Sequence, residues 1–253
     1  MTMTAVLPQS TGVRLGQAFV RTHFPTDVIV GVAAIALFII NWDSMAGWER
    51  IGYAAFIVLC VHQLEEYRFP GGFVWGLNMT MSSKIPDRYP GNALSATFVD
   101  VATTIIVGLW LFLWPSTGLV AFLILFSLLE VIGHTAFGII AYRRYRGVGK
   151  TTIYFPGNLT AYFGFGPLVI VGFHEFTTEN LLTGGEWGFV VLALVAFVVI
   201  GLGLPTTLGA REDSPFTYPV IQAQGYYLRR YEQLLIAAGA TPTATTDRHP
   251  ARH

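Results

Sequence analysis

The chain has 253 residues, of which 53% are hydrophobic and only 12% are charged, whereas an ordinary soluble domain carries roughly 25% charged residues. Basic and acidic residues balance at 15 each, which excludes the basic surface of a nucleic-acid-binding protein and the high net charge of a disordered chain. A single cysteine, Cys60, excludes a disulfide framework and a cysteine-based zinc site. The apolar residues lie in long runs, which predicts an integral membrane protein.

Six runs approach the length of about 20 mostly apolar residues that a membrane-spanning helix needs. In chain order, the predicted spans are Asp27–Trp42, Trp48–Glu66, Leu94–Trp114, Gly118–Tyr142, Ile153–Phe173 and Trp187–Leu208. The first is the shortest, so we expect it to be tilted or to be extended by residues 19–24. No cleavable signal peptide is expected. The predicted fold is an all-α, polytopic membrane helix bundle of about six transmembrane helices over residues 27–208.

The basic residues orient these spans. They gather before the first span, between the second and third, between the fourth and fifth, and after the sixth, whereas the other connections hold only Arg50. Because positive charge favours the cytoplasmic side, both termini are predicted to be cytoplasmic, in the cytoplasmic membrane of a prokaryote. Residues 1–26 form the N-terminal segment, residues 209–240 carry an amphipathic helix at Tyr218–Ala238, and residues 241–253 are expected to be a disordered tail.

Several ionisable residues lie inside the predicted spans, where each is unfavourable by ~2.5–3.5 kcal/mol. The second span has His62, Glu65 and Glu66, the third has Asp100, and the fourth has Glu130 and His134. The predicted directions of the helices place all six in the cytoplasmic half, but they place His174 and Glu175 on the opposite side. The spacing also favours a shared site, because residues three or four apart in the chain, such as Glu130 and His134, share one helix face.

Two histidines with four carboxylates predict a metal site. Apart from Arg50 at the outer end of the second span, no lysine or arginine lies within these spans to neutralise the carboxylates, and two divalent ions would balance them. Di-iron helix bundles use the same number of ligands. The candidate ligands are therefore His62, Glu65, Glu66, Asp100, Glu130 and His134, with Tyr154 and Asn158 as supporting donors. A zinc site with fewer ligands, or a proton relay without metal, are the alternatives.

Some of these residues have simpler interpretations. Asp100 could hydrogen-bond a neighbouring helix or cap a helix start, and Glu66 could lie at the water boundary, which would leave Glu65 as the buried acid of the pair. Asn158 could stabilise the start of its helix. The break at residues 69–73 should end the second span and begin a long loop, whose Phe69 and Phe73 could form a rim or lid.

The string His62-Gln-Leu-Glu65-Glu66-Tyr67, followed by Phe69-Pro-Gly-Gly-Phe73, resembles the HXXEE-domain membrane proteins. The later Glu130 and His134, and the segment from Tyr154 to Thr160, fit the same pattern, so the resemblance covers roughly residues 50–165. It implies a shared site more than a particular reaction.

From these residues we expect a membrane-embedded enzyme with a dinuclear, di-iron type centre that oxidises or hydroxylates a lipidic or apolar substrate. The HXXEE acids Glu65 and Glu66 are the candidate catalytic residues. The bilayer and an external electron donor are the expected partners, since no glycine-rich nucleotide fingerprint is present. The alternatives are a zinc-dependent intramembrane hydrolase with Glu65 or Glu66 as general base, and a proton- or cation-coupled transporter or receptor.

Overall fold

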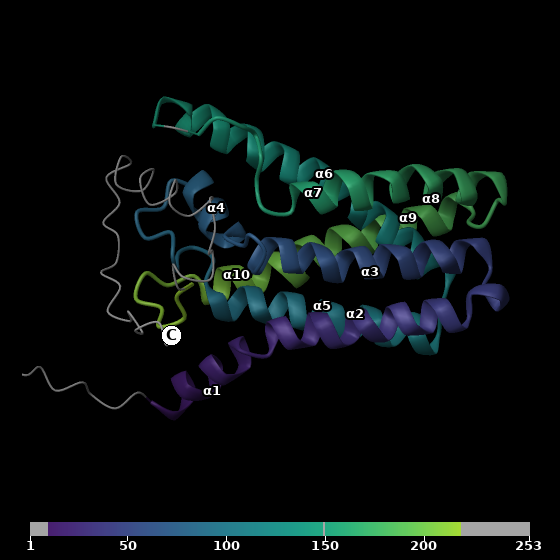
Figure 1. The fold of residues 1–253 in the computed structure, drawn as a ribbon, viewed down its shortest axis with the longest axis horizontal. Helices are drawn as coiled ribbons and strands as arrows, with labels where there is room; N and C mark the ends of the chain where they lie inside the picture. The colour runs from purple at the N-terminus through teal and green to yellow at the C-terminus, as the bar shows by residue number, and fades with distance from the viewer. Residues whose placement is uncertain (1–9, 149, 219–253) are drawn as a thin grey trace, which may run out of the picture.

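The computed structural model describes residues 10–148 and 150–218, and in this part of the chain all regular structure is helical (Figure 1). Five helical stretches are long and apolar enough to cross a membrane. They are Thr11–Ile40, Ala93–Leu113, Thr117–Tyr145, Asn158–Thr178 and Gly184–Gly209. The prediction of an all-α membrane helix bundle is therefore confirmed. The cytoplasmic location of the termini stays a prediction.

The predicted second span forms α3 (Gly47–Tyr67), which is less apolar than the other five because polar and ionisable residues lie along it. Its 21 residues measure about 32 Å at 1.5 Å per residue, which matches the thickness of a bilayer core. It packs against α2 (His23–Ile40), α6 (Thr117–Tyr145) and α8 (Gly166–Thr178), and it lies in the middle of the bundle (Figure 1). The polar side chains of α3 can therefore face protein instead of lipid.

Two spans begin five or more residues away from their predicted start. The first starts with α1 (Thr11–Val20), which leads almost directly into α2, so it is longer than the sequence indicated. The fifth starts at Asn158 and not at Ile153, because residues before a proline avoid helical geometry and Pro156 is followed by Gly157 at φ 95°. This span continues from α7 (Asn158–Thr160) through the π-helical segment η3 (Ala161–Phe165) into α8.

The expected break after α3 is confirmed, with Gly71 and Gly72 at φ 74° and 92°. The loop predicted after it is partly wrong, because it contains the helix α4 (Phe73–Thr80). The fully buried Asn78 fixes α4, since its amide donates 2.8 Å bonds to the carbonyl oxygens of Pro86 and Gly91 and accepts one of 2.8 Å from the Gly91 N–H. Arg144 of α6 donates to the last carbonyl groups of α4, which holds this helix across the end of the bundle.

The last span consists of α9 (Gly184–Ala196), the π-helical segment η4 (Phe197–Gly203) and α10 (Leu204–Gly209). Its first part packs against α6, and α10 packs against α5 (Ala93–Leu113). Except for Tyr218 itself, the predicted helix Tyr218–Ala238 and the predicted tail lie outside the described residues.

Candidate metal centre

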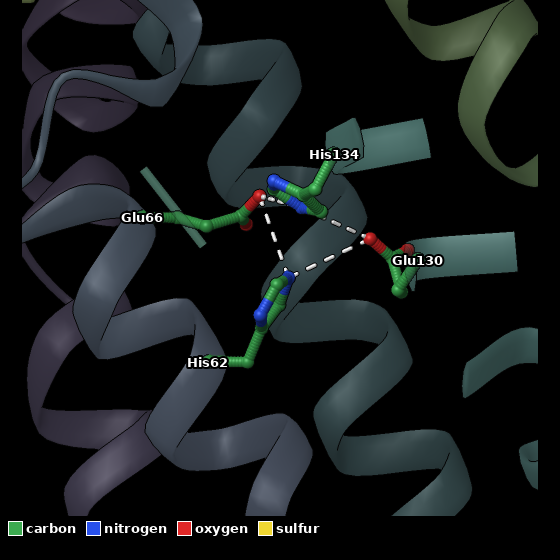
Figure 2. A group of neighbouring side chains, drawn as sticks. All are labelled: His62, Glu66, Glu130 and His134. Carbon is green, nitrogen blue, oxygen red and sulfur yellow. Dashed lines mark ion pairs between the residues drawn. The ribbon is translucent and has the colours of Figure 1, made fainter. Parts of the chain in front are cut away.

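Four ionisable side chains meet between α3 and α6. α3 supplies His62 and Glu66, and α6 supplies Glu130 and His134, each pair one helical turn apart. The two helices run in the same direction (Figure 1), so each histidine lies opposite the glutamate of the other helix. Histidine and glutamate consequently alternate around one point (Figure 2).

The distances within this ring are short and similar. His134 Nε2 lies 3.1 Å from Glu66 Oε1 and 3.2 Å from Glu130 Oε2. His62 Nε2 lies 3.5 Å from the same two oxygen atoms. One ligand atom from each of the four residues lies within 4.8 Å of every other.

The two histidine nitrogens point to a metal ligand set more than to ordinary hydrogen bonds. His62 Nε2 and His134 Nε2 are buried and make no hydrogen bond with acceptable geometry in the described structure, although carboxylate oxygens are close. Four ligand atoms around one tetrahedral ion at about 2.1 Å would be roughly 3.4 Å apart, which the four histidine-to-carboxylate spacings of 3.1–3.5 Å match, and all four atoms lie within 4.8 Å of one another. A divalent ion would also neutralise the two carboxylates. The residues present therefore fit a single metal ion.

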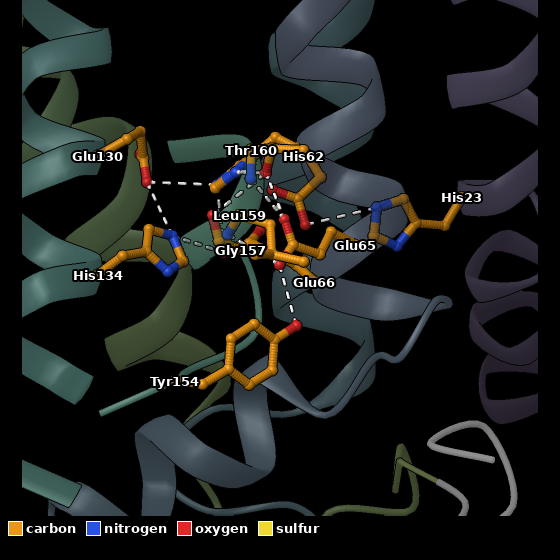
Figure 3. A network of polar contacts seen from close by, with 11 residues as sticks. His23, His62, Glu65, Glu66, Glu130, His134, Tyr154, Gly157, Leu159 and Thr160 are labelled. Carbon is orange, nitrogen blue, oxygen red and sulfur yellow. Dashed lines mark hydrogen bonds and ion pairs between the residues drawn. The ribbon is translucent and has the colours of Figure 1, made fainter. Parts of the chain in front are cut away.

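Glu65, a predicted ligand, faces away from this group toward the start of the fifth span (Figure 3). Its Oε1 accepts hydrogen bonds from the Tyr154 hydroxyl at 3.0 Å and the Leu159 N–H at 3.1 Å. Its Oε2 accepts bonds of 2.8 and 2.6 Å from the backbone and hydroxyl groups of Thr160. Glu65 thus caps a helix N-terminus, where a negative charge is favourable.

Thr160, which the sequence did not single out as a site residue, connects Glu65 to His62. Its Oγ1 lies 2.7 Å from His62 Nδ1 and also contacts Glu65 Oε2 and, at 3.1 Å, the Gly157 carbonyl oxygen. The hydroxyl proton goes to one of these acceptors, so the oxygen accepts the His62 Nδ1–H. His62 then carries its free electron pair on Nε2, which faces the metal centre.

His134 is held by packing instead. Its ring lies 5.3 Å from the Phe73 ring and 6.2 Å from the Phe155 ring, measured between centroids, and its Nδ1 has no hydrogen-bond partner in the described structure. The backbone of Gly157 lies against the same ring, and a Cβ there would be 2.8 Å from His134 Nδ1. The glycine therefore makes room for the histidine.

The two predicted supporting residues have different positions. Tyr154 donates to Glu65, which also accepts from Thr160, and Thr160 contacts His62. Asn158 donates to the Tyr162 hydroxyl at 3.0 Å, and that hydroxyl lies 3.0 Å from Thr135 Oγ1 of α6. Asn158 and Tyr162 therefore link the fifth span to α6.

Asp100, the remaining predicted ligand, is not part of the four-residue group. Its Oδ2 lies 3.5 Å from His23 Nε2, and His23 is also 3.5 Å from Asp27 Oδ2. This second polar cluster joins α2 to α5. The i,i+4 spacing of His23 and Asp27 matches that of the metal pairs, so the sequence held a signal for it, although His23 lies before the predicted start of the span.

A cavity of about 340 Å³ lies beside the metal group, a size typical of small-molecule sites. Its walls include all four residues of the group, Asp100, and many apolar side chains, among them Leu59, Phe73, Val99, Phe126 and Phe197. Phe69 and Phe73 are the residues predicted to form a rim or lid. Phe73 lines this cavity, whereas Phe69 is exposed.

The helices and the buried group together define a membrane protein with four converging side chains that are able to hold a metal ion. Residues 53–172 match a family model described as "Protein of unknown function with HXXEE motif". Over this region, which holds the motif residues His62, Glu65 and Glu66, the chain is therefore similar to the HXXEE family. A comparison with curated proteins and with solved structures found no match.

Proposed function

We propose that this protein is a membrane-embedded, metal-dependent enzyme that acts on an apolar substrate. The observation that carries the proposal is the convergence of two buried imidazole Nε2 atoms without hydrogen-bond partners and two carboxylates beside a largely apolar cavity. Buried, partly unsatisfied polar groups inside a membrane mark functional sites more often than structural ones.

The arrangement supports a centre with one ion, in place of the two-ion centre expected from six ligands. Of the six predicted ligands, four converge, because Glu65 caps a helix and Asp100 contacts His23. Two carboxylates and one divalent ion have no net charge, which suits a site in low dielectric. Two histidines and one carboxylate with open positions are the ligand set of non-haem iron oxygenases, and this group adds a second carboxylate.

Oxidation of a hydrocarbon group by molecular oxygen is the reaction that the cavity favours. An iron ion held by His62, Glu66, Glu130 and His134 would supply the oxygen-activating chemistry. Inserting one oxygen atom into a C–H bond and reducing the other to water consumes two electrons and two protons, so an external electron donor is required. The apolar walls would hold the substrate and exclude bulk water.

Zinc-dependent hydrolysis is the second candidate, and one observation favours it. Asp100 lines the same cavity without belonging to the metal group, so it is a carboxylate in reach of a substrate and could act as general base. This role would replace the one predicted for Glu65 or Glu66.

The deciding experiment is elemental analysis of detergent-purified protein, wild type beside His62→Ala and His134→Ala. His174→Ala is the matched control, because that histidine is exposed and distant in sequence from the group. Near-stoichiometric iron that is lost in both variants but kept in the control is the expected result. Zinc in the same pattern would support hydrolysis. If no protein binds metal after incubation with ferrous or zinc salts, the enzyme proposal is wrong and a proton or cation pathway becomes the better explanation.

A further inference from the structure

A long groove separates two of the membrane-spanning helices. α9 packs against α6, while α5 packs against α1, α2, α3 and α10, and between α5 and α9 lies an apolar groove of about 800 Å³. One wall is a single face of α5 from Phe98 to Trp110, which is roughly 18 Å long at 1.5 Å per residue. The opposite wall includes Phe189 and Ala193 of α9.

The groove opens toward the lipid. Both walls belong to candidate membrane spans, and lining residues such as Ile106 and Phe189 are 62% and 71% exposed. The groove also runs along the helices, and therefore along the direction in which lipid chains lie in a bilayer. Its shape and lining fit one extended hydrocarbon chain better than a compact polar molecule.

The groove and the metal cavity share a wall. Val99, Thr103 and Phe197 line both spaces. The Phe197 ring meets Phe122 of the groove edge-on at 5.7 Å and Phe126 of the cavity at 5.8 Å, measured between ring centroids. Phe197 therefore lies between the lipid side and the metal side.

The backbone around Phe197 differs from an ordinary α-helix. The π-helical segment η4 places Val198 and Leu202 in the cavity wall, and Ile200 and Gly201 in the groove wall. Such π-helical turns are rare and occur frequently at functional sites. The partition between the two spaces is thus one irregular stretch of a helix that is mostly lipid-exposed.

We propose that this groove binds the hydrocarbon chain of a membrane lipid and that the chain reaches the metal cavity past Phe197. This inference rests on the proposed function, which it deepens by naming the substrate class as a long-chain lipid. The chain enters from the side, through the opening between α5 and α9, without leaving the bilayer.

The test uses phosphatidylcholine vesicles that contain a phosphatidylcholine with a photoreactive diazirine on its acyl chain. After illumination, mass spectrometry of peptides locates the adducts. The expected result is an adduct on Phe126, which is only 7% exposed and lines the cavity, so lipid around the outside of the bundle cannot label it.

Two variants narrow the groove from opposite walls. Ala193→Trp fills it from α9, and Thr103→Trp obstructs the passage from α5, so labelling of Phe126 should be lost in both. Val191→Trp is the matched control, because Val191 is on the same helix, is 49% exposed and lies outside the groove. Labelling of Phe126 that persists in both groove variants, or is absent in the wild type, overturns the inference.

Metal content measured on the same samples separates this inference from the proposed function. Groove-dependent labelling of a protein that binds no metal would keep the lipid site and reject the enzyme. A metal-loaded protein without groove-dependent labelling would keep the metal centre and reject the lipid route. A second copy of the chain covering the groove, detected as a dimer in which Phe126 is not labelled, would also reject that route.

Discussion

His62 Nδ1 and Thr160 Oγ1 lie 2.7 Å apart although 98 residues separate them in the chain. The contact joins the HXXEE motif on α3 to the beginning of the fifth span. Since Glu65 accepts hydrogen bonds from the same threonine, the motif has two separate roles. His62 and Glu66 face the metal group, and Glu65 fixes the helix that orients His62.

Thr160→Val should weaken metal binding by about 10- to 100-fold, the usual effect of removing a partner that orients a metal-binding histidine. Without the hydroxyl oxygen, His62 loses the acceptor for its Nδ1–H, and the tautomer with a free Nε2 is no longer favoured. Thr160→Ser keeps the hydroxyl and should retain most of the affinity. Titration of metal-free protein with ferrous or zinc salt measures this. Equal affinity of the valine variant and the wild type would mean that Thr160 does not orient His62.

Glu66→Gln and Glu65→Gln should separate metal binding from stability. Glu66→Gln removes a ligand charge and should abolish metal occupancy. Glu65→Gln should leave metal bound but lower the free energy of unfolding by about 1–3 kcal/mol, because buried N–H and hydroxyl donors lose a charged acceptor. Metal analysis and denaturation of both variants check this. The reverse pattern would place Glu65 and not Glu66 at the metal.

The sequence predicted the fold class because long apolar runs and balanced charge leave few alternatives to a helical membrane protein. It also predicted which helices would meet, since His62 and Glu66 on α3 and Glu130 and His134 on α6 have one-turn spacing and similar depth. Glu66 is only 6% exposed, so it does not lie at the water boundary.

The sequence could not distinguish Glu65 from Glu66. Both are three or four residues from His62, and a difference of about 100° around the helix decides which one faces α6. Which of its two predicted roles Asp100 takes could not be decided from the sequence for a related reason. Depth alone put it beside the metal residues, but its rotation on α5 brings it to His23, a residue outside the predicted spans. Rotation of a helix about its own axis follows from packing, which a hydropathy pattern does not define.

Gly157→Ala should disturb both the fold and the metal centre. Gly157 has φ 95°, where an L-residue is disfavoured by about 1–2 kcal/mol, and the added Cβ would lie 2.8 Å from His134 Nδ1. We expect a lower melting temperature together with reduced metal content. Gly118→Ala is the control, because nothing lies within 4 Å of a Cβ at that position. Full metal content in Gly157→Ala would show that His134 can move without leaving the centre.

Removing the metal should destabilise the wild-type protein, because an ion that binds only the folded state adds to its stability. At a free metal concentration 100 times the dissociation constant, this contribution is about 2.7 kcal/mol. A chelator should therefore lower the apparent melting temperature in detergent, and added ferrous or zinc salt should restore it. Glu66→Gln should melt at the same temperature with and without chelator, because it has lost a ligand, whereas His174→Ala should respond like the wild type. If the chelator strips the metal from the wild type and leaves its melting temperature unchanged, the ion is not held by the buried α3–α6 group, since ligands from two packed helices cannot release it without losing the link between them.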